Sequence, residues 1–272
     1  MIQALYSLPE FYHQFHGIGK VEAIFYRNLA ASSADILELG CGTGRLWPLF
    51  HGQPSRYLGI DLTFAMLKYF KAQGEGELAI EESEASCSST GSFQTVRLLQ
   101  ASWDQIPLPS GSVDHVILPL NSILHCSGMI GLRTLFLEVN RVLRKSGECW
   151  IQLINCQSHR FRTSLGTDNI LALEADLREL QLKGTGIGRI TKVVERIDSI
   201  VGPNEMEEAS LQWILYGSQE KKILQETICL FRASEISKVM SESGFKGVQR
   251  FGDFSLRPWR NQDSWVVLRG DT

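Results

Sequence analysis

The stretch Asp35-Ile-Leu-Glu-Leu-Gly-Cys-Gly-Thr-Gly-Arg45 decides the fold of this chain. Its first half is mostly apolar, which is typical of a parallel strand buried on both faces. Gly40, Gly42 and Gly44 follow at once, and glycine lets the backbone turn tightly and approach a ligand closely. The next segment, 45–50, can begin a helix whose first amide groups point at that ligand. We therefore predict a strand, a glycine turn and a helix that together hold a cofactor.

The spacing of the glycines argues against a dinucleotide cofactor. The dinucleotide fingerprint is G-x-G-x-x-G after a strand, and the position of its third glycine is occupied here by Arg45. Glu38 lies two residues before the first glycine, where a carboxylate can accept hydrogen bonds from an ammonium group or from the turn. The stretch therefore predicts a nucleoside cofactor other than a nicotinamide dinucleotide.

A second acid, Asp61, ends the next strand-like run, 56–61, at about the distance where nucleotide-binding α/β folds place the acid that binds ribose hydroxyls. One carboxylate can accept from both vicinal hydroxyls. Because a helix is expected from residue 63, Asp61 could instead stabilise the helix N-terminus, and the two roles are compatible. We expect Asp61 to bind ribose.

The rest of the chain alternates strands and helices and predicts an α/β, Rossmann-like, doubly wound sheet of seven strands. Residues 155–231 interrupt this alternation with a helical pattern at 168–182 and three partly alternating strand patterns. We predict a core of residues 1–154 and 232–272, and an inserted small antiparallel sheet at 155–231 that caps the site or forms a homodimer surface. The other strands of the core are expected at 35–39, 96–100, 115–120, 149–154, 245–254 and 263–269.

The end of the fourth core strand carries the best catalytic candidates, because ligands bind at the carboxyl ends of parallel strands. Pro119, Asn121, Ser122 and His125 lie there, and the pKa range of histidine suits a base. His125 could alternatively only shape the pocket. The N-terminal pattern at 8–30 predicts a helix that brings Tyr12 over the site, or aromatic residues that belong only to the core. Its second half has an apolar stripe at Val21, Ile24, Phe25 and Leu29.

Composition excludes several other classes of protein. The net charge of −3 gives no electrostatic case for nucleic acid or an anionic membrane surface. We see neither a membrane-spanning run nor a signal peptide, and we expect a cytoplasmic protein. The six cysteines form no C-x-x-C pair and match no zinc spacing, so we expect reduced thiols and no metal site. Residues 73–94 are acidic and serine-rich, which predicts a surface insertion.

Several motifs, taken together, resemble a known family. The run from Glu38 to Gly44 closely resembles motif I of class I S-adenosylmethionine (SAM) methyltransferases, and 59–67 resembles their motif II. The loop at 101–107 resembles the family's adenine-binding loop, except that Ser102 occupies the usual acid position and Asp104 lies two residues out of register. The resemblance implies these cofactor-binding residues: Tyr12, Glu38, Gly40, Cys41, Gly42, Gly44, Asp61, Leu62, Met66, Ser102, Trp103 and Pro119.

Within that family the chain is most similar to small-molecule N-methyltransferases of the glycine and amino-sugar types. DNA methyltransferases carry Asn/Asp-Pro-Pro-aromatic after strand four, whereas this chain has Leu118-Pro-Leu-Asn121. The resemblance implies methyl transfer from SAM to an amine or hydroxyl of a small molecule, with S-adenosyl-L-homocysteine as product and His125 and Asn121 as catalytic residues. The alternatives are a SAM-binding module without activity and an aminopropyl transferase, for which we find no acidic polyamine-binding cluster.

Overall fold

The computed structural model describes residues 2–32, 34–73, 79–82, 97–171, 190–202, 206–217 and 221–272. Its larger sheet has parallel central strands, and only its last two pairings, β13 with β7 and β12 with β13, are antiparallel. The strands lie in the order β12 (Lys246–Phe251), β13 (Trp265–Asp271), β7 (Leu143–Ile154), β6 (Val113–Leu118), β2 (Asp35–Leu39), β3 (Arg56–Asp61), β5 (Arg97–Gln100) and β4 (Ala79–Glu82).

The seven predicted core strands are all present, and the Rossmann-like fold class is confirmed. The eighth strand, β4, lies at the sheet edge and comes from the stretch that we expected to be a surface insertion. Successive strands run outward from β2 in both directions, toward β3 and β5 on one side and toward β6 and β7 on the other. Such a reversal of strand order opens a crevice at the carboxyl ends of the strands.

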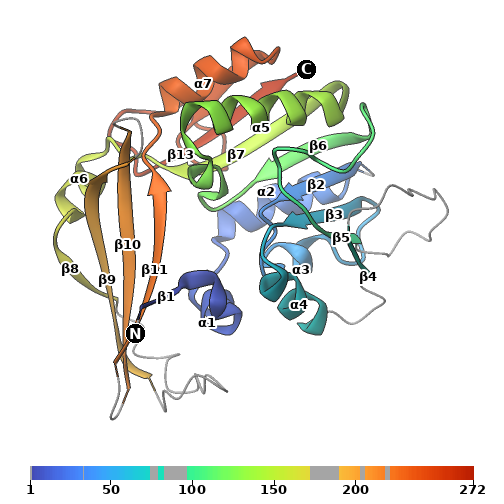
Figure 1. Ribbon diagram of the computed structural model, residues 1–272. Helices are drawn as coiled ribbons and strands as arrows, with labels where there is room; N and C mark the ends of the chain where they lie inside the picture. The colour runs from blue at the N-terminus through green and yellow to red at the C-terminus, as the bar shows by residue number, and fades with distance from the viewer. Residues whose placement is uncertain are drawn as a thin grey trace.

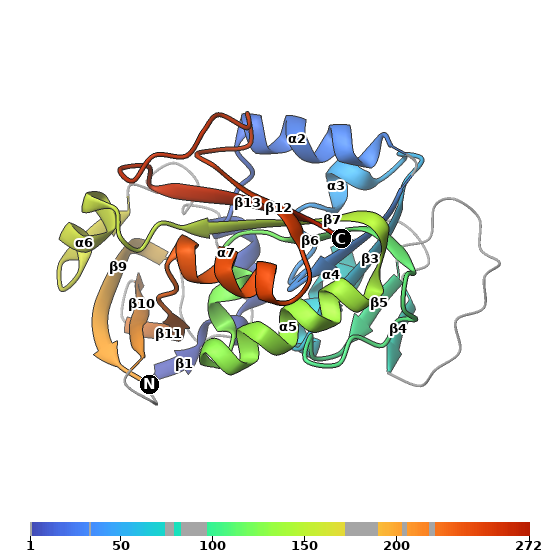
Figure 2. The same ribbon diagram turned by 90° about the horizontal axis from the view of Figure 1, so that it is seen from above.

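Helices cover both faces of this sheet (Figure 2). On one face lie α2 (Lys20–Ala30), α3 (Trp47–Phe50) and α4 (Phe64–Gln73), which contribute Tyr26, Phe50 and Phe70 to one apolar cluster. On the other face, α5 (Gly128–Val142) and α7 (Ala233–Glu242) pack their apolar sides on the strands. None of the helices in the described ranges is long and apolar enough to cross a membrane.

The buried face of α2 agrees only in part with the predicted apolar stripe. Val21 and Ile24 are 48% and 60% exposed, whereas Glu22, Tyr26 and Ala30 are buried. Phe25 and Leu29 of the predicted apolar stripe do pack against the core, so the stripe was wrong only at Val21 and Ile24. Glu22 is buried because it forms an ion pair with Arg45, a partner outside the helix.

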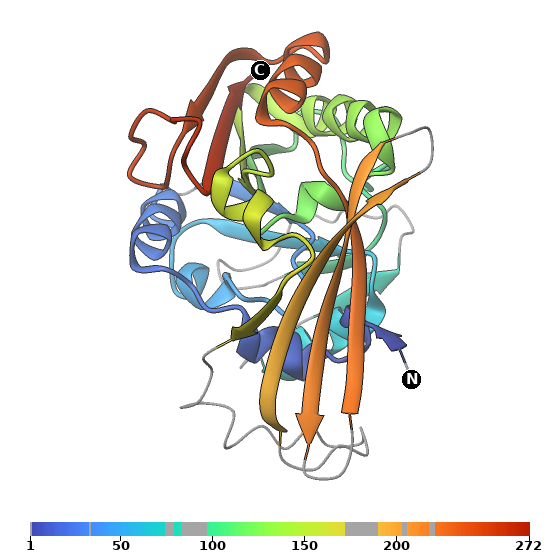
Figure 3. The ribbon, with the colours of Figure 1, turned by 90° about the vertical axis from the view of Figure 1, so that its left-hand side faces the viewer.

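A second, five-stranded sheet stands beside the core (Figures 1 and 3). We call it the lid sheet. Its strands lie in the order β1 (Ile2–Ala4), β11 (Lys221–Cys229), β10 (Glu207–Gly217), β9 (Ile190–Val201) and β8 (Asp168–Leu171). The antiparallel strands β9, β10 and β11 are those predicted within the insertion, and β1 adds to them a parallel strand from the beginning of the chain.

The predicted helix at 168–182 is wrong in its first part, because residues 168–171 form β8 and pair with β9. An adjacent strand can override a local helical pattern by supplying backbone partners. The remainder of that predicted helix lies outside the described residues.

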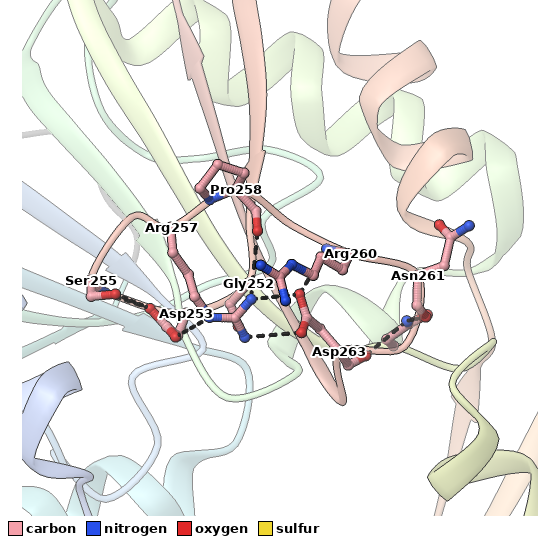
Figure 4. A network of polar contacts seen from close by, with 9 residues as sticks. Gly252, Asp253, Ser255, Arg257, Pro258, Arg260, Asn261 and Asp263 are labelled. Carbon is pink, nitrogen blue, oxygen red and sulfur yellow. Dashed lines mark hydrogen bonds and ion pairs between the residues drawn. The ribbon is translucent and has the colours of Figure 1, made fainter.

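The connection between β12 and β13 is held by polar contacts (Figure 4). The Arg257 guanidinium donates to Asp253 and to Asp263, and Asp253 also accepts from the backbone amide of Ser255. The side-chain amide of Asn155 donates to the carbonyls of Asn261 and Asp263. These contacts fix the end of β7, and α6 (His159–Ser164) follows it.

Candidate active site

A cavity of about 370 Å³ opens at the carboxyl ends of β2, β3, β5 and β6. Its volume lies in the range of about 300–1,000 Å³ that is typical of small-molecule sites. The walls include these predicted site residues: Tyr12, Gly40, Gly42, Asp61, Leu62, Met66, Ser102, Trp103 and His125. The walls also include Ser122, one of the catalytic candidates at the end of the fourth core strand. Seven further wall residues were not predicted to bind cofactor or to act in catalysis: Tyr6, Ile60, Thr63, Ala101, Asp104, Leu120 and Ser127.

The glycine turn forms one side of the cavity. Gly40 and Gly42 have φ angles of 73° and 53°, in the left-handed region that favours glycine. The backbone amides of Gly40 and Cys41 both donate to the carbonyl of Ile60, at 2.8 and 3.0 Å. A Cβ at Gly40 would lie only 2.8 Å from Oγ of Ser122. Glycine is therefore required at this position by both the turn and the packing.

Asp61 connects the glycine turn to the helix that follows β3. One carboxylate oxygen accepts from the amide of Gly42 at 2.8 Å, and the other accepts from the amide of Thr63 at 2.8 Å. Burial raises the pKa of Asp61, and the two backbone hydrogen bonds oppose that change. Each oxygen keeps a further lone pair, so the carboxylate can accept additional donors from the cavity.

Ser102 and Asp104 act as a pair at the opposite wall. The Ser102 hydroxyl donates to the Asp104 carboxylate at 3.1 Å, and the backbone amide of Asp104 donates back to the Ser102 hydroxyl at 3.2 Å. Both residues line the cavity, together with Trp103. The turn therefore places the Asp104 carboxylate in this wall, where the alignment of the loop had indicated only the Ser102 hydroxyl.

Five of the predicted residues do not line the cavity. The Glu38 carboxylate accepts from the Tyr57 hydroxyl at 2.5 Å, and burial raises its pKa to about 8. The side-chain oxygen of Asn121 accepts from the amide of Ile154 at 2.7 Å, which fixes the end of β7. The other three support the walls through the backbone or by packing. They are Cys41, Gly44 and Pro119.

His125 lines the cavity from the short helix η2 (Ser122–His125). Its Nε2 is 2.7 Å from the hydroxyl of Tyr6, and that hydroxyl donates to the Glu226 carboxylate at 2.5 Å. Burial lowers the pKa of His125 to about 4, so the ring is neutral at neutral pH. Burial raises the pKa of Glu226 to about 7, despite the lowering effect of the Tyr6 hydrogen bond.

Sequence reasoning missed Tyr6 and Glu226. Tyr6 lies on η1 (Leu5–Ser7), and Glu226 lies on β11 of the lid sheet, 220 residues away. One indication was available, since Leu224 and Ile228 are apolar and alternate with Glu226 on one face of the strand. A single acid at an inward position of a strand indicates either a buried partner or a functional site.

The N-terminal segment 2–17 joins the lid sheet to the glycine turn. Its β1 pairs with β11, and α1 (Pro9–Phe15) then places Tyr12 in the cavity wall. His13 Nδ1 lies 3.0 Å from the Thr43 hydroxyl, and the carbonyl of Gly17 accepts from Arg45 at 3.2 Å. The segment therefore contacts the lid at one end and the turn at the other.

Comparison with known proteins finds one family match and several similar folds. A family model described as a methyltransferase domain matches residues 37–151. None of the curated proteins compared matches the sequence. The similarities to solved structures are therefore similarities of fold.

The chain is similar in fold to the CcbJ methyltransferase from Streptomyces caelestis, with a TM-score of 0.74, 17% identity, and coverage of 98% of this chain and 97% of that chain. It is also similar to the sugar N-methyltransferase KedS8 from Streptoalloteichus (TM-score 0.61, 15% identity, coverage 93% and 87%). SAM-bound CalS10, an amino pentose methyltransferase from Micromonospora echinaspora, gives a TM-score of 0.56, 14% identity and coverage of 92% and 90%. The chain thus has the fold of the class I SAM-dependent methyltransferases, and its residues 37–151 match a methyltransferase domain.

Proposed function

We propose that this chain is a SAM-dependent methyltransferase that transfers a methyl group to an amine or hydroxyl of a small molecule. One observation carries the proposal. A single cavity combines the glycine turn and Asp61 at one wall with Tyr6 and His125 at another. A cofactor and an acceptor held in those two halves would have their reacting atoms close together, which is the main requirement of a transfer reaction.

The cofactor half fits SAM. The lone pairs that remain on Asp61 suit two ribose hydroxyls, and the open backbone at Gly40 and Gly42 admits a ligand where a side chain would collide. The Ser102–Asp104 turn offers a carboxylate to the adenine amino group, with Leu62 and Met66 as apolar cover. When bound, SAM supplies a methyl group that is already activated by the positive charge of its sulfonium.

The acceptor half is suited to a small polar nucleophile. Tyr6, Tyr12 and His125 line it, and the rings of the two tyrosines lie 5.7 Å apart. The neutral ring of His125 can accept or donate a hydrogen bond, and the Tyr6 oxygen can accept one from an N–H or O–H group. The size of the cavity favours a small-molecule acceptor over a nucleic acid or a membrane surface.

SAM binding is the first test. Calorimetry should show binding of SAM and of S-adenosyl-L-homocysteine, and no comparable binding of NAD. Asp61→Asn should weaken SAM binding about 10- to 100-fold, because charged hydrogen bonds contribute about 1.5–3 kcal/mol. Asp253→Asn is the matched control, since Asp253 also accepts from the amide two residues later but lies in the β12–β13 connection. Equal SAM affinity in the two variants would remove Asp61 from the cofactor site.

Methyl transfer is the second test. We would incubate the protein with methyl-labelled SAM and glucosamine, tyramine, catechol or a simple diamine, and measure label in each product. Transfer to at least one of these, lost on denaturation, is the expected result. Tight SAM binding without transfer to any of these or other small acceptors would favour the alternative, a SAM-binding module without activity of its own. No binding of SAM by the wild-type protein would contradict both.

A further inference from the structure

Tyr6, Glu226 and His125 form a polar chain that begins in the cavity and ends inside the lid sheet. The Tyr6 hydroxyl contacts His125 Nε2 at 2.7 Å and Glu226 Oε2 at 2.5 Å, while Glu226 Oε2 lies 3.4 Å from His125 Nε2. The Glu226 side chain is 12% exposed and does not line the cavity, whereas Tyr6 does. Tyr6 is therefore the group that connects Glu226, by a hydrogen bond, to an acceptor bound in the cavity.

The positions of the protons in this chain follow from its donors and acceptors. Tyr6 has one hydroxyl proton, and the short distance to Glu226 indicates that Tyr6 donates this proton in a hydrogen bond to the carboxylate. The Tyr6 oxygen then accepts from Nε2–H of neutral His125, which leaves one lone pair of the phenol for a further donor. A bound N–H or O–H group in the cavity can fill that place.

A buried carboxylate at this position needs an explanation. Glu226 lies between the inward residues Leu224 and Ile228, and its partner across the ladder on β10 is the apolar Leu211. In the part of the chain that the structure describes, no lysine or arginine is shown to pair with the Glu226 carboxylate. Burying an unpaired charge is costly, so an acid kept at such a place indicates a role that a glutamine or leucine would not fill.

We propose that Glu226 takes up, through the Tyr6 hydroxyl, the proton that the methyl acceptor loses, and that His125 positions Tyr6 for this transfer. The acceptor's N–H or O–H proton passes to the Tyr6 oxygen while the hydroxyl proton of Tyr6 passes to the Glu226 carboxylate. Tyr6 is a neutral phenol before and after, Glu226 changes from carboxylate to carboxylic acid, and the freed electron pair of the acceptor is available to form the new bond to carbon. This inference rests on the proposed methyltransferase function and deepens its acceptor half.

The charges around Glu226 suit this role. The titratable groups that face it are Tyr6 on η1, Tyr12 on α1, His125 on η2 and Glu195 on β9. Burial raises the pKa of Glu226 to about 7, the Tyr6 hydrogen bond lowers it, and the charge of Glu195 raises it. His125, with a pKa lowered to about 4, is the weaker proton acceptor of the two. A carboxylate of this basicity takes a proton from an ammonium group more readily than from an alcohol, so the proposal favours amine acceptors.

The first experiment needs no acceptor. The side-chain carboxyl of Glu226, labelled with ¹³C and assigned by comparison with Glu226→Gln, would be followed by NMR from pH 4 to 9 in the SAM-free protein. The wild-type carboxyl should titrate near pH 7. Glu195→Gln should move that midpoint to lower pH because a negative charge is removed, and Tyr6→Phe should move it to higher pH because a hydrogen bond to the carboxylate is lost. A midpoint close to the ordinary value for glutamate, about 4.3, would overturn the proposal.

The second experiment measures methyl transfer to whichever amine in the panel reacts fastest. Glu226→Gln keeps the shape and can still accept from Tyr6, yet it should lower kcat about 100-fold, the scale of acid–base catalysis, and remove the fall in rate below pH 7. Tyr6→Phe should do the same, and the double variant should lose little more than either single one. Glu195→Gln, which removes a charge from the same sheet, should keep the high-pH rate and shift the fall in rate to lower pH.

SAM affinity separates the two proposals. Glu226→Gln should bind SAM as the wild type does, because Glu226 does not line the cavity and reaches it only through Tyr6. A wild-type protein that binds and uses SAM, with a Glu226→Gln variant that retains the wild-type kcat and pH profile, would overturn the role of Glu226 and leave the methyltransferase proposal intact. A wild-type protein that binds no SAM would instead contradict the methyltransferase proposal itself.

Discussion

The guanidinium of Arg45 forms an ion pair with Glu22 at 2.7 Å, and both side chains are less than one tenth exposed. Arg45 occupies the position of the third glycine in a dinucleotide fingerprint, and it donates from its second terminal nitrogen to the carbonyl of Gly17. The pair therefore attaches α2 and the end of the N-terminal segment to the glycine turn. This contact explains why an arginine follows the last glycine of the turn.

We expect Arg45→Met to lower the free energy of unfolding by about 3–5 kcal/mol, because it leaves the Glu22 carboxylate buried without a partner. Urea denaturation at pH 7 measures the change. The double variant with Glu22→Met should lose less than Arg45→Met alone, since no buried charge remains. Lys238→Met, which breaks the exposed Lys238–Glu242 pair, is the control and should cost no more than about 0.5 kcal/mol. A loss from Arg45→Met as small as the control's would contradict a structural role for the buried pair.

Gly44 and Gly52 offer a matched test of packing at the glycine turn. Their φ angles are 76° and 74°, so alanine is strained equally at both. A Cβ at Gly44 would lie 2.4 Å from the Phe70 ring, whereas at Gly52 it would meet nothing within 4 Å. Gly52→Ala should cost about 1–2 kcal/mol of stability, and Gly44→Ala about 1–3 kcal/mol more, because of overpacking. Thermal and urea unfolding of the two variants, compared under one set of conditions, measure the difference, and equal losses would show that the turn relaxes away from Phe70.

Glu38 should make stability depend on pH. Burial raises its pKa to about 8 in the folded state, whereas an unfolded glutamate titrates near about 4.3. Between those values the folded chain holds a proton that the unfolded chain has released, so unfolding becomes easier as pH rises, by up to about 1.4 kcal/mol per pH unit. Glu38→Gln removes this term and can still accept from Tyr57. The stability of the variant relative to wild type should therefore increase from pH 5 to pH 8, and a constant difference across that range would contradict the raised pKa.

Asp104 should contribute to recognition of adenine. Asp104→Asn replaces a charged acceptor by a neutral one, and we expect SAM affinity to fall about tenfold, with Asp198→Asn on the exposed part of β9 as a neutral control. The loss should be smaller for a SAM analogue in which oxygen replaces the adenine amino group. Calorimetry with both ligands measures it, and an equal loss for the two would show that Asp104 acts on some other part of the ligand.

The glycine turn and the position of Asp61 beside it could be predicted from the sequence because their determinants are local. Gly40, Gly42 and Asp61 follow or end two adjacent strands. An apolar run that stops at a glycine or an acid indicates the end of a strand, and this can be recognised without knowing the distant contacts. Ser102 was suggested by the resemblance of its loop to a known family, and it lines the cavity. Its turn with Asp104 is a three-dimensional detail that the sequence did not indicate.

The Tyr6–Glu226 contact and the burial of Glu22 on α2 could not be predicted, because the partners lie far away in the sequence. Tyr6 and Glu226 come together only because β1 pairs with β11, and nothing near either residue indicates that pairing. From its local sequence Glu22 would similarly be expected on the exposed side of a helix, and its burial is explained only by the ion pair with Arg45. The prediction of a helix at 168–171 was wrong for the same reason, because β9 supplies the backbone partners that make this segment a strand despite its local helical pattern.

The N-terminal segment has a mechanical consequence. Because β1 pairs with β11 of the lid sheet while His13 and Gly17 contact the glycine turn, the segment links the two by direct contacts. Any displacement of the lid sheet would therefore be transmitted through this segment to the glycine turn. If the proposed cofactor and acceptor bind as we infer, a cofactor that stiffens the turn would also hold Tyr6 and Glu226 in place, and the two binding events would be coupled.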